Sequence, residues 1–184
     1  MSSPTRFWLS TGVGESDVSE LEAIDAAFIN SGLGYQNHVI VSSIPPVTEI
    51  FPKIDKENGV THIQVDNELK LLQFSSIIHV VRAMKNGRGG ETIASSIALG
   101  KISVEIEGKL HECMLAYETI GSNLEEIEED AIICLKNMVK KRNAQIDLSW
   151  GNSGIKIISS SLKVKKEYGC SISFVVFDPF TSKK

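Results

Sequence analysis

NHVIVSSIPP, residues 37–46, places β-branched residues directly before a pair of serines and a pair of prolines. The β-branched run predicts a strand over residues 36–43. Pro45 and Pro46 end this strand, because proline has no backbone N–H and restricts the residue before it. Ser42-Ser43 is then either an ordinary polar strand end or a bond that a serine hydroxyl breaks by attacking the preceding carbonyl. The second interpretation requires a strained peptide and a donor that polarises the carbonyl.

On the N-terminal side of this segment the pattern predicts a strand over residues 6–11, ended by GVGES, and a helix over residues 18–31. Ser19 followed three residues later by Glu22 has the form of a capping box, and Gly32 stands where a C-terminal glycine belongs. The predicted apolar stripe of this helix consists of Leu21, Ile24 and Phe28, with Asp25 at its border.

On the C-terminal side, residues 47–72 read as loop with short strands, and residues 75–84 as a buried strand. Residues 85–90 read as a glycine-rich loop, 91–107 as strand broken at Gly100, and 107–109 as a hairpin turn before another strand. A helix is predicted over 123–144, with Ser122 and Glu125 as a capping box, acids at its start and basic residues at its end. Two strands follow, so the order of elements predicts a single α+β domain over residues 1–184.

The composition excludes several classes of protein. The chain has 184 residues, 42% hydrophobic content and a net charge of -4, which suits one compact domain and does not favour nucleic-acid binding. No apolar run is long enough to span a bilayer. The three cysteines and four histidines are scattered, so neither a disulfide framework nor a metal site is predicted. We expect a cytoplasmic protein with reduced thiols.

The glycine clusters give little support to nucleotide binding. TGVGES (11–16) contains GxG between a predicted strand and a predicted helix, but Asp17 stands where a dinucleotide fingerprint requires its third glycine. NGRGGE (86–91) lacks the Gly-Lys-Ser/Thr of a phosphate-binding loop. A small ligand-binding module that uses these loops remains one alternative hypothesis.

Four segments, taken in order, change the interpretation of the serine pair. They are STGVGES (10–16), EAIDAAFINSGLG (22–34), NHVIVSSIPP (37–46) and GGETIASSIALG (89–100), with weaker similarity in AYETIG (116–121) and KEYGCSISFVVF (166–177). Together they resemble the pyruvoyl-dependent arginine decarboxylases over nearly the whole chain. The most specific piece is the Ser-Ser-Ile segment with an Asn five residues before its first serine.

The resemblance implies a fold, an activity and a set of site residues. The fold would be an αββα four-layer sandwich. Self-cleavage between Ser42 and Ser43 would give a small chain, 1–42, and a large chain, 43–184, with Ser43 converted to a covalent pyruvoyl group. Asn37 would position or polarise the scissile carbonyl, Glu91 would be the catalytic acid, and Asp25 would bind the cationic end of the substrate. The enzyme would convert arginine to agmatine and CO₂, with the pyruvoyl group as the electron sink.

The resemblance also implies a homotrimer of cleaved protomers, with each active site between two subunits, and a role in polyamine synthesis or acid consumption. The sequence departs from the family at two points. The family usually has a residue between Ser-Ser-Ile and the two prolines, whereas here Ile44 directly precedes Pro45-Pro46. The family's segment before the Glu91 position is commonly apolar and aromatic with an acid near its end, whereas here it carries Arg82, Lys85 and Arg88. Positive charge near a site for a cationic side chain is unfavourable. Two alternatives therefore stand beside arginine decarboxylation: a decarboxylase of another amino acid, and an uncleaved, non-enzymatic trimeric relative.

Overall fold

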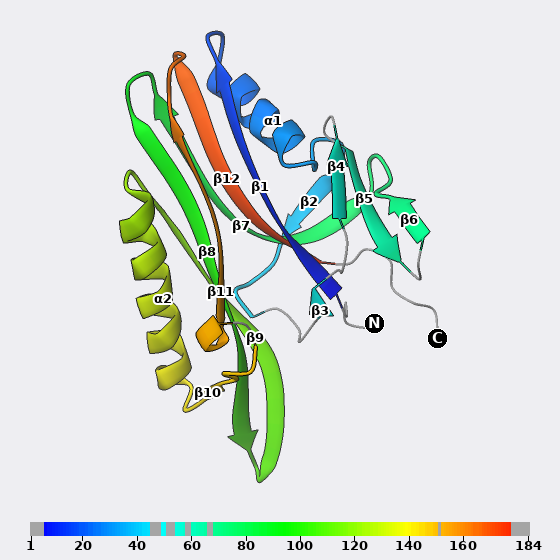
Figure 1. The fold of residues 1–184 in the computed structure, drawn as a ribbon, viewed down its shortest axis with the longest axis vertical. Helices are drawn as coiled ribbons and strands as arrows, with labels where there is room; N and C mark the ends of the chain where they lie inside the picture. The colour runs from blue at the N-terminus through cyan, green and yellow to red at the C-terminus, as the bar shows by residue number, and fades with distance from the viewer. Residues whose placement is uncertain are drawn as a thin grey trace.

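The structure is a computed structural model that describes residues 6–44, 49–50, 54–57, 60–65, 68–150 and 152–177. It is a mixed α+β fold dominated by sheet, as predicted (Figure 1). The first sheet has the strand order β2-β7-β12-β1-β3. Its strands are β1 (Arg6–Ser16), β2 (Asn37–Ile40), β3 (Glu49–Ile50), β7 (Ile77–Arg88) and β12 (Tyr168–Phe177).

The second sheet is centred on β8 (Thr92–Ile106). This strand pairs with β9 (Lys109–Gly121), β11 (Ile155–Lys163) and the short β10 (Gln145–Ile146). A small third sheet contains β4 (Ile54–Glu57), β5 (Val60–Val65) and β6 (Glu68–Leu71). The remaining elements are helices α1 (Glu20–Asn30) and α2 (Leu124–Lys141) and a 3₁₀ turn, η1 (Asn152–Gly154).

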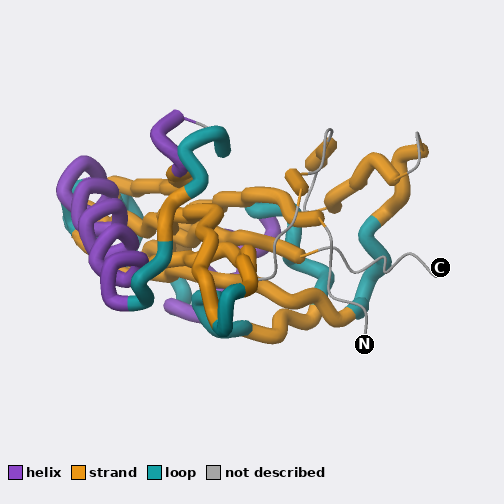
Figure 2. The backbone as a smooth tube through the Cα atoms, turned by 90° about the horizontal axis from the view of Figure 1, so that it is seen from below, coloured by secondary structure: helices purple, strands orange, loops and turns teal. Residues whose placement is uncertain are grey.

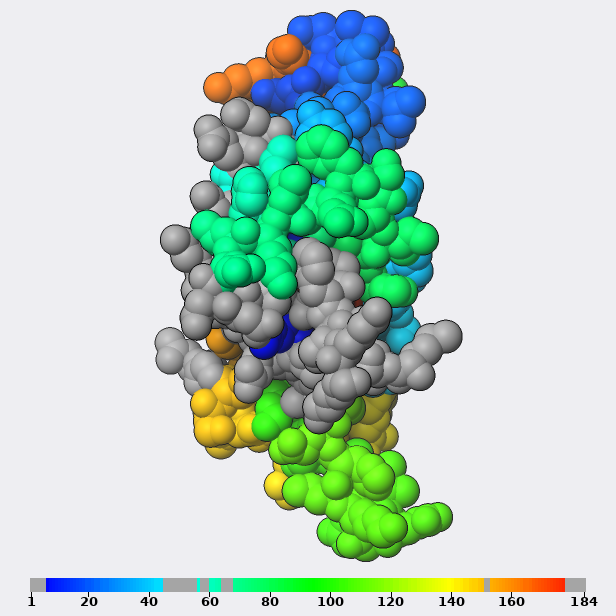
Figure 3. Space-filling model, turned by 90° about the vertical axis from the view of Figure 1, so that its right-hand side faces the viewer, coloured from blue at the N-terminus to red at the C-terminus, as the bar shows by residue number. Residues whose placement is uncertain are grey.

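Three apolar clusters show how these elements pack. The first lies between α1 and the first sheet and includes Trp8, Ala27 and Phe174. The second lies between the two large sheets and includes Phe7, Val175 and Leu99. The third lies between the second sheet and α2, which covers the outer face of that sheet (Figure 2). The hairpin of β8 and β9 extends beyond these layers and forms the projecting end of the space-filling view (Figure 3).

The glycines of the first strand allow α1 to pack directly on it. The predicted strand ended at Thr11, whereas β1 continues to Ser16 through both glycines. A Cβ atom on Gly12 would lie 2.1 Å from the carbonyl oxygen of Ala27, and one on Gly14 would lie 2.2 Å from that of Ala23. Only glycine permits such a close approach between a strand and a helix backbone. Packing of α1 therefore explains why Gly12 and Gly14 are glycines.

The capping of α1 agrees in part with the prediction. Ser19 is the N-cap and its side chain accepts a hydrogen bond from the backbone N–H of Glu22. Gly32 follows the helix with φ +80°, as a C-terminal glycine does. The predicted apolar stripe was wrong at Leu21, which is 75% exposed. The glycines bring the helix so close that the small Ala23 and Ala27 take the buried positions.

Glycine positions account for other differences from the prediction as well. β7 extends to Arg88, so the predicted loop at 85–90 is only a tight turn at 89–90. β8 passes through Gly100 without a break. There a Cβ would lie 3.3 Å from Leu135 of α2, so this glycine also marks helix packing. The hairpin turn at Glu107 and Gly108 is confirmed, with φ values of 52° and 72°.

The second helix is shorter than the predicted 123–144, and its N-cap lies one residue later than predicted. Asn123, and not Ser122, is the N-cap of α2, and its side chain accepts from the N–H groups of Glu125 and Glu126. Its acidic first turn and basic last turn complement the helix dipole, as predicted. Ile127, Ala131, Leu135 and Val139 form its buried face.

Candidate functional site

The segment Val41–Ser42–Ser43 crosses from the first sheet to the second. The backbone N–H of Val41 donates to the carbonyl oxygen of Val80 in β7 at 2.9 Å. The carbonyl oxygen of Ser43 accepts from the backbone N–H of Ala116 in β9, also at 2.9 Å. Within the described residues, the peptide group that joins Ser42 to Ser43 makes no hydrogen bond. The bond predicted to break is therefore held on both sides and unpaired in the middle.

The hydroxyl of Ser43 is directed at a carboxylate. Its Oγ donates to Glu118 of β9, with distances of 3.1 Å to Oε2 and 3.3 Å to Oε1. Ser43 is half-buried at this contact, whereas Ser42 is exposed. A carboxylate that accepts a serine hydroxyl is placed to take its proton as the oxygen becomes a nucleophile. Of the two serines, Ser43 is thus the one with a base beside it.

Strand geometry explains why Ala116 and Glu118 meet this segment. Residues two apart in a strand lie on the same face, and β9 is the edge of its sheet on this side. Ala116 is opposite Leu99 and Glu118 is opposite Ile97, and both of these partners belong to the cluster between the sheets. Glu118 therefore faces the space between the sheets, at the edge where the 41–43 segment crosses.

Asn37 lies at the start of β2, away from the serine pair. Its side-chain amide donates to the carbonyl oxygen of Ser75 at 3.0 Å, and its backbone N–H donates to Ser76 at 2.8 Å. Five residues of extended chain, about 16 Å, separate it from Ser42. Within one chain Asn37 fixes the start of β2 and does not contact the carbonyl that it is predicted to polarise.

Glu91 lies in the turn between β7 and β8. Its Oε2 accepts the backbone N–H of Arg88 at 2.7 Å, and its backbone carbonyl accepts the N–H of Val164. The residue before the serine pair, Val41, bonds Val80 of β7. Arg88, which holds Glu91, lies eight residues further along this strand, so Glu91 is roughly 25 Å from the serine pair. Its side chain is exposed. The burial expected of a catalytic acid is thus absent at Glu91 in the single chain.

Asp25 projects from α1 and is exposed. α1 covers one face of the first sheet, while Ser43 bonds the second sheet beyond the other face. The first sheet therefore separates Asp25 from Ser43 within one chain. Of the five predicted site residues, a single chain brings together only Ser42 and Ser43, which are adjacent in sequence.

His38 stabilises the strand that leads to the serine pair. Its ring packs 4.9 Å from the ring centroid of Phe28 and 5.4 Å from that of Phe174. Nε2 lies 3.1 Å from the carbonyl oxygen of Leu33, an acceptor, so Nε2 carries the hydrogen. Burial lowers the pKa of His38, the charge of Arg82 lowers it further, and the hydrogen bond to Leu33 opposes both. The ring is accordingly neutral at pH 7.

Two of the three basic residues of β7, Arg82 and Arg88, lie away from the Ser43 contact. Lys85 lies two residues from Ala83, which belongs to the cluster between the sheets, so Lys85 is on the face toward the second sheet. Arg82 pairs with Phe174, which belongs to the cluster beneath α1, so its side chain shares that face of the sheet. Arg88 lies 4.2 Å over the ring of Tyr168 and 3.9 Å from the carboxylate of Glu167. Neither guanidinium approaches Glu118 in the described chain.

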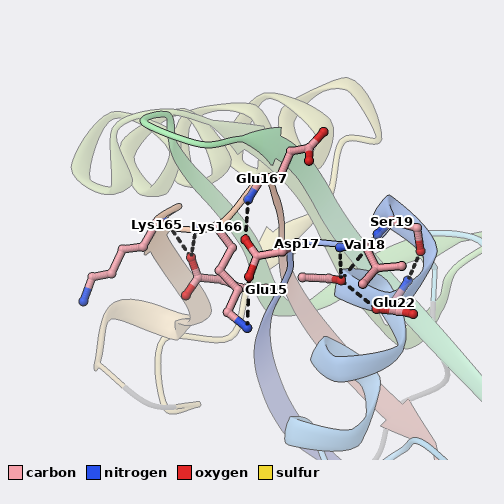
Figure 4. Close-up of polar contacts among 9 residues, drawn as sticks. Glu15, Asp17, Val18, Ser19, Glu22, Lys165, Lys166 and Glu167 are labelled. Atoms are coloured by element: carbon pink, nitrogen blue, oxygen red, sulfur yellow. Dashed lines mark hydrogen bonds and ion pairs between the residues drawn. The ribbon is translucent and has the colours of Figure 1, made fainter.

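Two acidic side chains at the end of β1 bind the backbone of residues 165–167 (Figure 4). Glu15 accepts the backbone N–H groups of Lys165 and Lys166, and Asp17 accepts that of Glu167. Asp17 also forms an ion pair with Lys166 at 3.7 Å. Because carboxylates already bind these donors, the arrangement offers no support for a phosphate site at the glycine strand.

Glu118 is the acidic residue that sequence reasoning missed. Its only signal was its place in AYETIG (116–121), a segment of weak similarity. It is 75 residues from Ser43, so only the pairing of β9 with the rest of the second sheet reveals the contact. No cluster of metal ligands occurs among the described residues. No described helix has the length and apolar character needed to cross a bilayer.

Comparison with known proteins identifies a family. A family model described as pyruvoyl-dependent arginine decarboxylase (PvlArgDC) matches residues 6–182. No curated protein matches the chain.

Proposed function

The chain belongs to the pyruvoyl-dependent arginine decarboxylase family, and from this premise we propose that it is a self-processing enzyme that converts arginine to agmatine and CO₂. It cuts itself between Ser42 and Ser43, and Ser43 becomes the pyruvoyl group. The active form is a cytoplasmic homotrimer of cleaved protomers, each a single domain with the family's αββα four-layer sandwich. Packing of α1, the two large sheets and α2 in sequence supports that architecture.

One observation carries the self-processing proposal: the Ser43 hydroxyl donates to Glu118 while the chain on both sides of the scissile peptide is anchored to different sheets. Glu118 takes the hydroxyl proton as Oγ attacks the carbonyl carbon of Ser42. The C–N bond breaks, and the same proton passes to the nitrogen of Ser43, which leaves an ester between the two residues. The local groups thus fit the first step of pyruvoyl formation.

The second step removes the α-proton of Ser43. The Cβ–Oγ bond then breaks, and Ser42 leaves with Oγ as a carboxylate at the end of chain 1–42. Glu118 contacts Oγ, which is two bonds from Cα, and is our candidate base for this proton as well. Hydrolysis of the dehydroalanine that remains releases ammonia. When formed, the pyruvoyl group supplies an electron sink for loss of CO₂ from an amino acid.

Two acids are candidates for the proton that replaces CO₂ on the substrate. The resemblance implies Glu91, whose place at the turn requires a neighbouring copy to bring it to Ser43. The contact with Ser43 favours Glu118, which stays beside that position after the hydroxyl has left. We propose Glu118 as the acid of its own chain, with Glu91 as the alternative.

The trimer proposal is supported by the surface around the serine pair. β2 is an edge strand of the first sheet, and several large apolar side chains near it are exposed: Tyr35, Val39, Ile40, Ile44, Phe74 and Ile77. An exposed strand edge with apolar side chains favours contact with another chain. In a trimer, Asp25 and Asn37 of one copy then approach Ser43 of the next. Asp25 there pairs with the guanidinium of arginine.

The test is release of CO₂ and agmatine from arginine by purified wild-type protein, with Ser43→Ala as the control. Lysine, ornithine and histidine are assayed in parallel. Product from arginine alone, absent in Ser43→Ala, is the expected result. Product from another amino acid in place of arginine would contradict the assignment of substrate. No product from a fully cleaved sample would contradict it too.

A further inference from the structure

The carbonyl of Ser43 has a partner of its own, separate from that of the hydroxyl. Its oxygen accepts the backbone N–H of Ala116 at 2.9 Å, while Oγ contacts Glu118. Ala116 is fully buried at this edge of the second sheet. Since its N–H is directed at Ser43, it is not part of the ladder to β8, and Ala116 with Leu99 forms a non-hydrogen-bonded pair.

The two halves of self-cleavage place negative charge on different oxygens. Attack by Oγ places charge on the carbonyl oxygen of Ser42. Removal of the α-proton of Ser43 places charge on the carbonyl oxygen of Ser43, because Cα is conjugated with that carbonyl in the enolate. Cβ–Oγ cleavage then uses the enolate electron pair to form the Cα=Cβ bond and releases the carboxylate of Ser42. The N–H of Ala116, which donates to the Ser43 carbonyl oxygen, therefore meets developing negative charge only in the elimination step.

We propose that the backbone N–H of Ala116 stabilises the enolate of Ser43 in the elimination half of self-cleavage. The inference rests on the proposed function. A fixed donor on a buried residue, aimed at the oxygen on which charge develops, is the arrangement that stabilises an oxyanion. The strand holds the N–H in place before the reaction, so no reorganisation is required.

A purely structural anchor would behave differently. If the hydrogen bond only held Ser43 against β9, its loss would displace the hydroxyl from Glu118 and slow the first half of cleavage. If it stabilises the enolate, its loss slows the second half, and the ester between Ser42 and Ser43 accumulates. Hydroxylamine distinguishes the two cases because it cleaves an ester but not an ordinary peptide.

Ala116→Pro removes this N–H without removing a ladder hydrogen bond, since the group is directed away from β8. Glu112→Pro is the matched control, because Glu112 lies an even number of residues away on β9 and its N–H shares the outward direction. Unfolding temperature and circular dichroism establish that each variant is folded. Cleavage is followed by denatured mass, with and without hydroxylamine.

We expect formation of the 43–184 pyruvoyl chain to slow about 100-fold in Ala116→Pro, the effect of removing one oxyanion donor. The uncut Ala116→Pro chain should be split by hydroxylamine into a 1–42 hydroxamate and a 43–184 chain with a free amino terminus. Glu112→Pro should cleave at the wild-type rate.

Wild-type cleavage rates in Ala116→Pro would overturn the inference, as would a folded, uncut chain that resists hydroxylamine. If Ala116→Pro fails to fold, lactic acid at position 116 decides, because it replaces only the N–H by oxygen. Its own backbone ester yields 1–115 and 116–184 fragments of different mass. An uncut, hydroxylamine-resistant wild type would instead contradict the proposed function as a whole.

Discussion

At Ser43 the hydroxyl and the carbonyl are held by different groups, Glu118 and Ala116, so one residue is prepared for two successive bond changes. The sequence predicted the serine pair because its strand, its prolines and the Asn before it form one continuous pattern. It did not predict Glu118, because the contact joins residues 75 positions apart. Linear patterns contain no information on which edge strand a crossing segment meets.

Glu118→Gln tests the base at this position. An amide cannot take the hydroxyl proton, so we expect the rate of self-cleavage to fall about 100- to 10,000-fold. The measurement is the fraction of uncut chain by denatured mass at intervals after synthesis. Glu112→Gln serves for comparison, and its cleavage should proceed at the wild-type rate because Glu112 is an exposed acid of the same strand that does not contact Ser43. Rapid cleavage of Glu118→Gln would remove Glu118 from the mechanism.

His38 gives a prediction on acid stability. Its pKa in the folded chain is lowered by burial from an ordinary value of 6.5. In the pH range between these two pKa values the unfolded chain binds a proton and the folded chain does not. The free energy of unfolding should therefore decrease as pH falls below about 6.5 and level off once the folded chain is protonated.

Urea titrations of the uncleavable Ser43→Ala chain at pH 5 to 8 measure this dependence. Ser43→Ala with His38→Gln keeps a side-chain N–H donor without a titrating group and should lose the part of the slope due to His38. The charged group that acts on the ring, Arg82 of β7, is present in both variants. Its own contribution to stability therefore cancels when the two slopes are compared. Equal slopes would show that His38 is not the titrating group.

Among the elements, α1 and β1 show most clearly why a linear pattern misplaces glycine. In a linear pattern, glycine predicts a turn or a break, and this gave a short first strand, a long loop at 85–90 and a broken β8. In the fold, Gly12, Gly14 and Gly100 lie inside strands because a helix backbone or a helix side chain occupies the space of a Cβ. Helix and strand identities were predictable from periodicity, whereas strand ends depended on packing across layers.

Gly14→Ala tests this account of the first strand. The added Cβ meets the Ala23 carbonyl at 2.2 Å, against backbone that cannot rotate away. We expect a loss of about 1–3 kcal/mol in the free energy of unfolding, as for other overpacked cores. Gly100→Ala is the matched control in another strand, because its nearest contact is a Leu135 methyl group at 3.3 Å. Denaturant unfolding in the Ser43→Ala background should rank Gly14→Ala as the more destabilising. The reverse order would contradict the packing explanation.

For the whole molecule, the main consequence is that one chain does not assemble the complete set of predicted residues. Asp25 lies across a sheet from Ser43, and Asn37 lies at the far end of β2. If the site forms between copies, an inactive Ser43→Ala chain and an inactive Asp25→Ala chain should complement each other. Mixed trimers made by co-expression should recover part of the wild-type decarboxylation of arginine.

Each variant expressed alone supplies the control for that experiment. A mixture that stays as inactive as its parents, while containing mixed trimers by native mass, would contradict a site shared between subunits. Neither the trimer nor the shared site follows from the residues of one chain. Both come from the resemblance, with support from the exposed apolar side chains around β2.

Every proposed step depends on breakage of the bond between Ser42 and Ser43. The most direct measurement is the denatured mass of freshly expressed protein beside Ser43→Ala. We predict two fragments from the wild type, 1–42 and 43–184, with the larger blocked to Edman degradation, and one intact chain from Ser43→Ala. One uncut chain in both samples would contradict the account and favour the uncleaved, non-enzymatic relative.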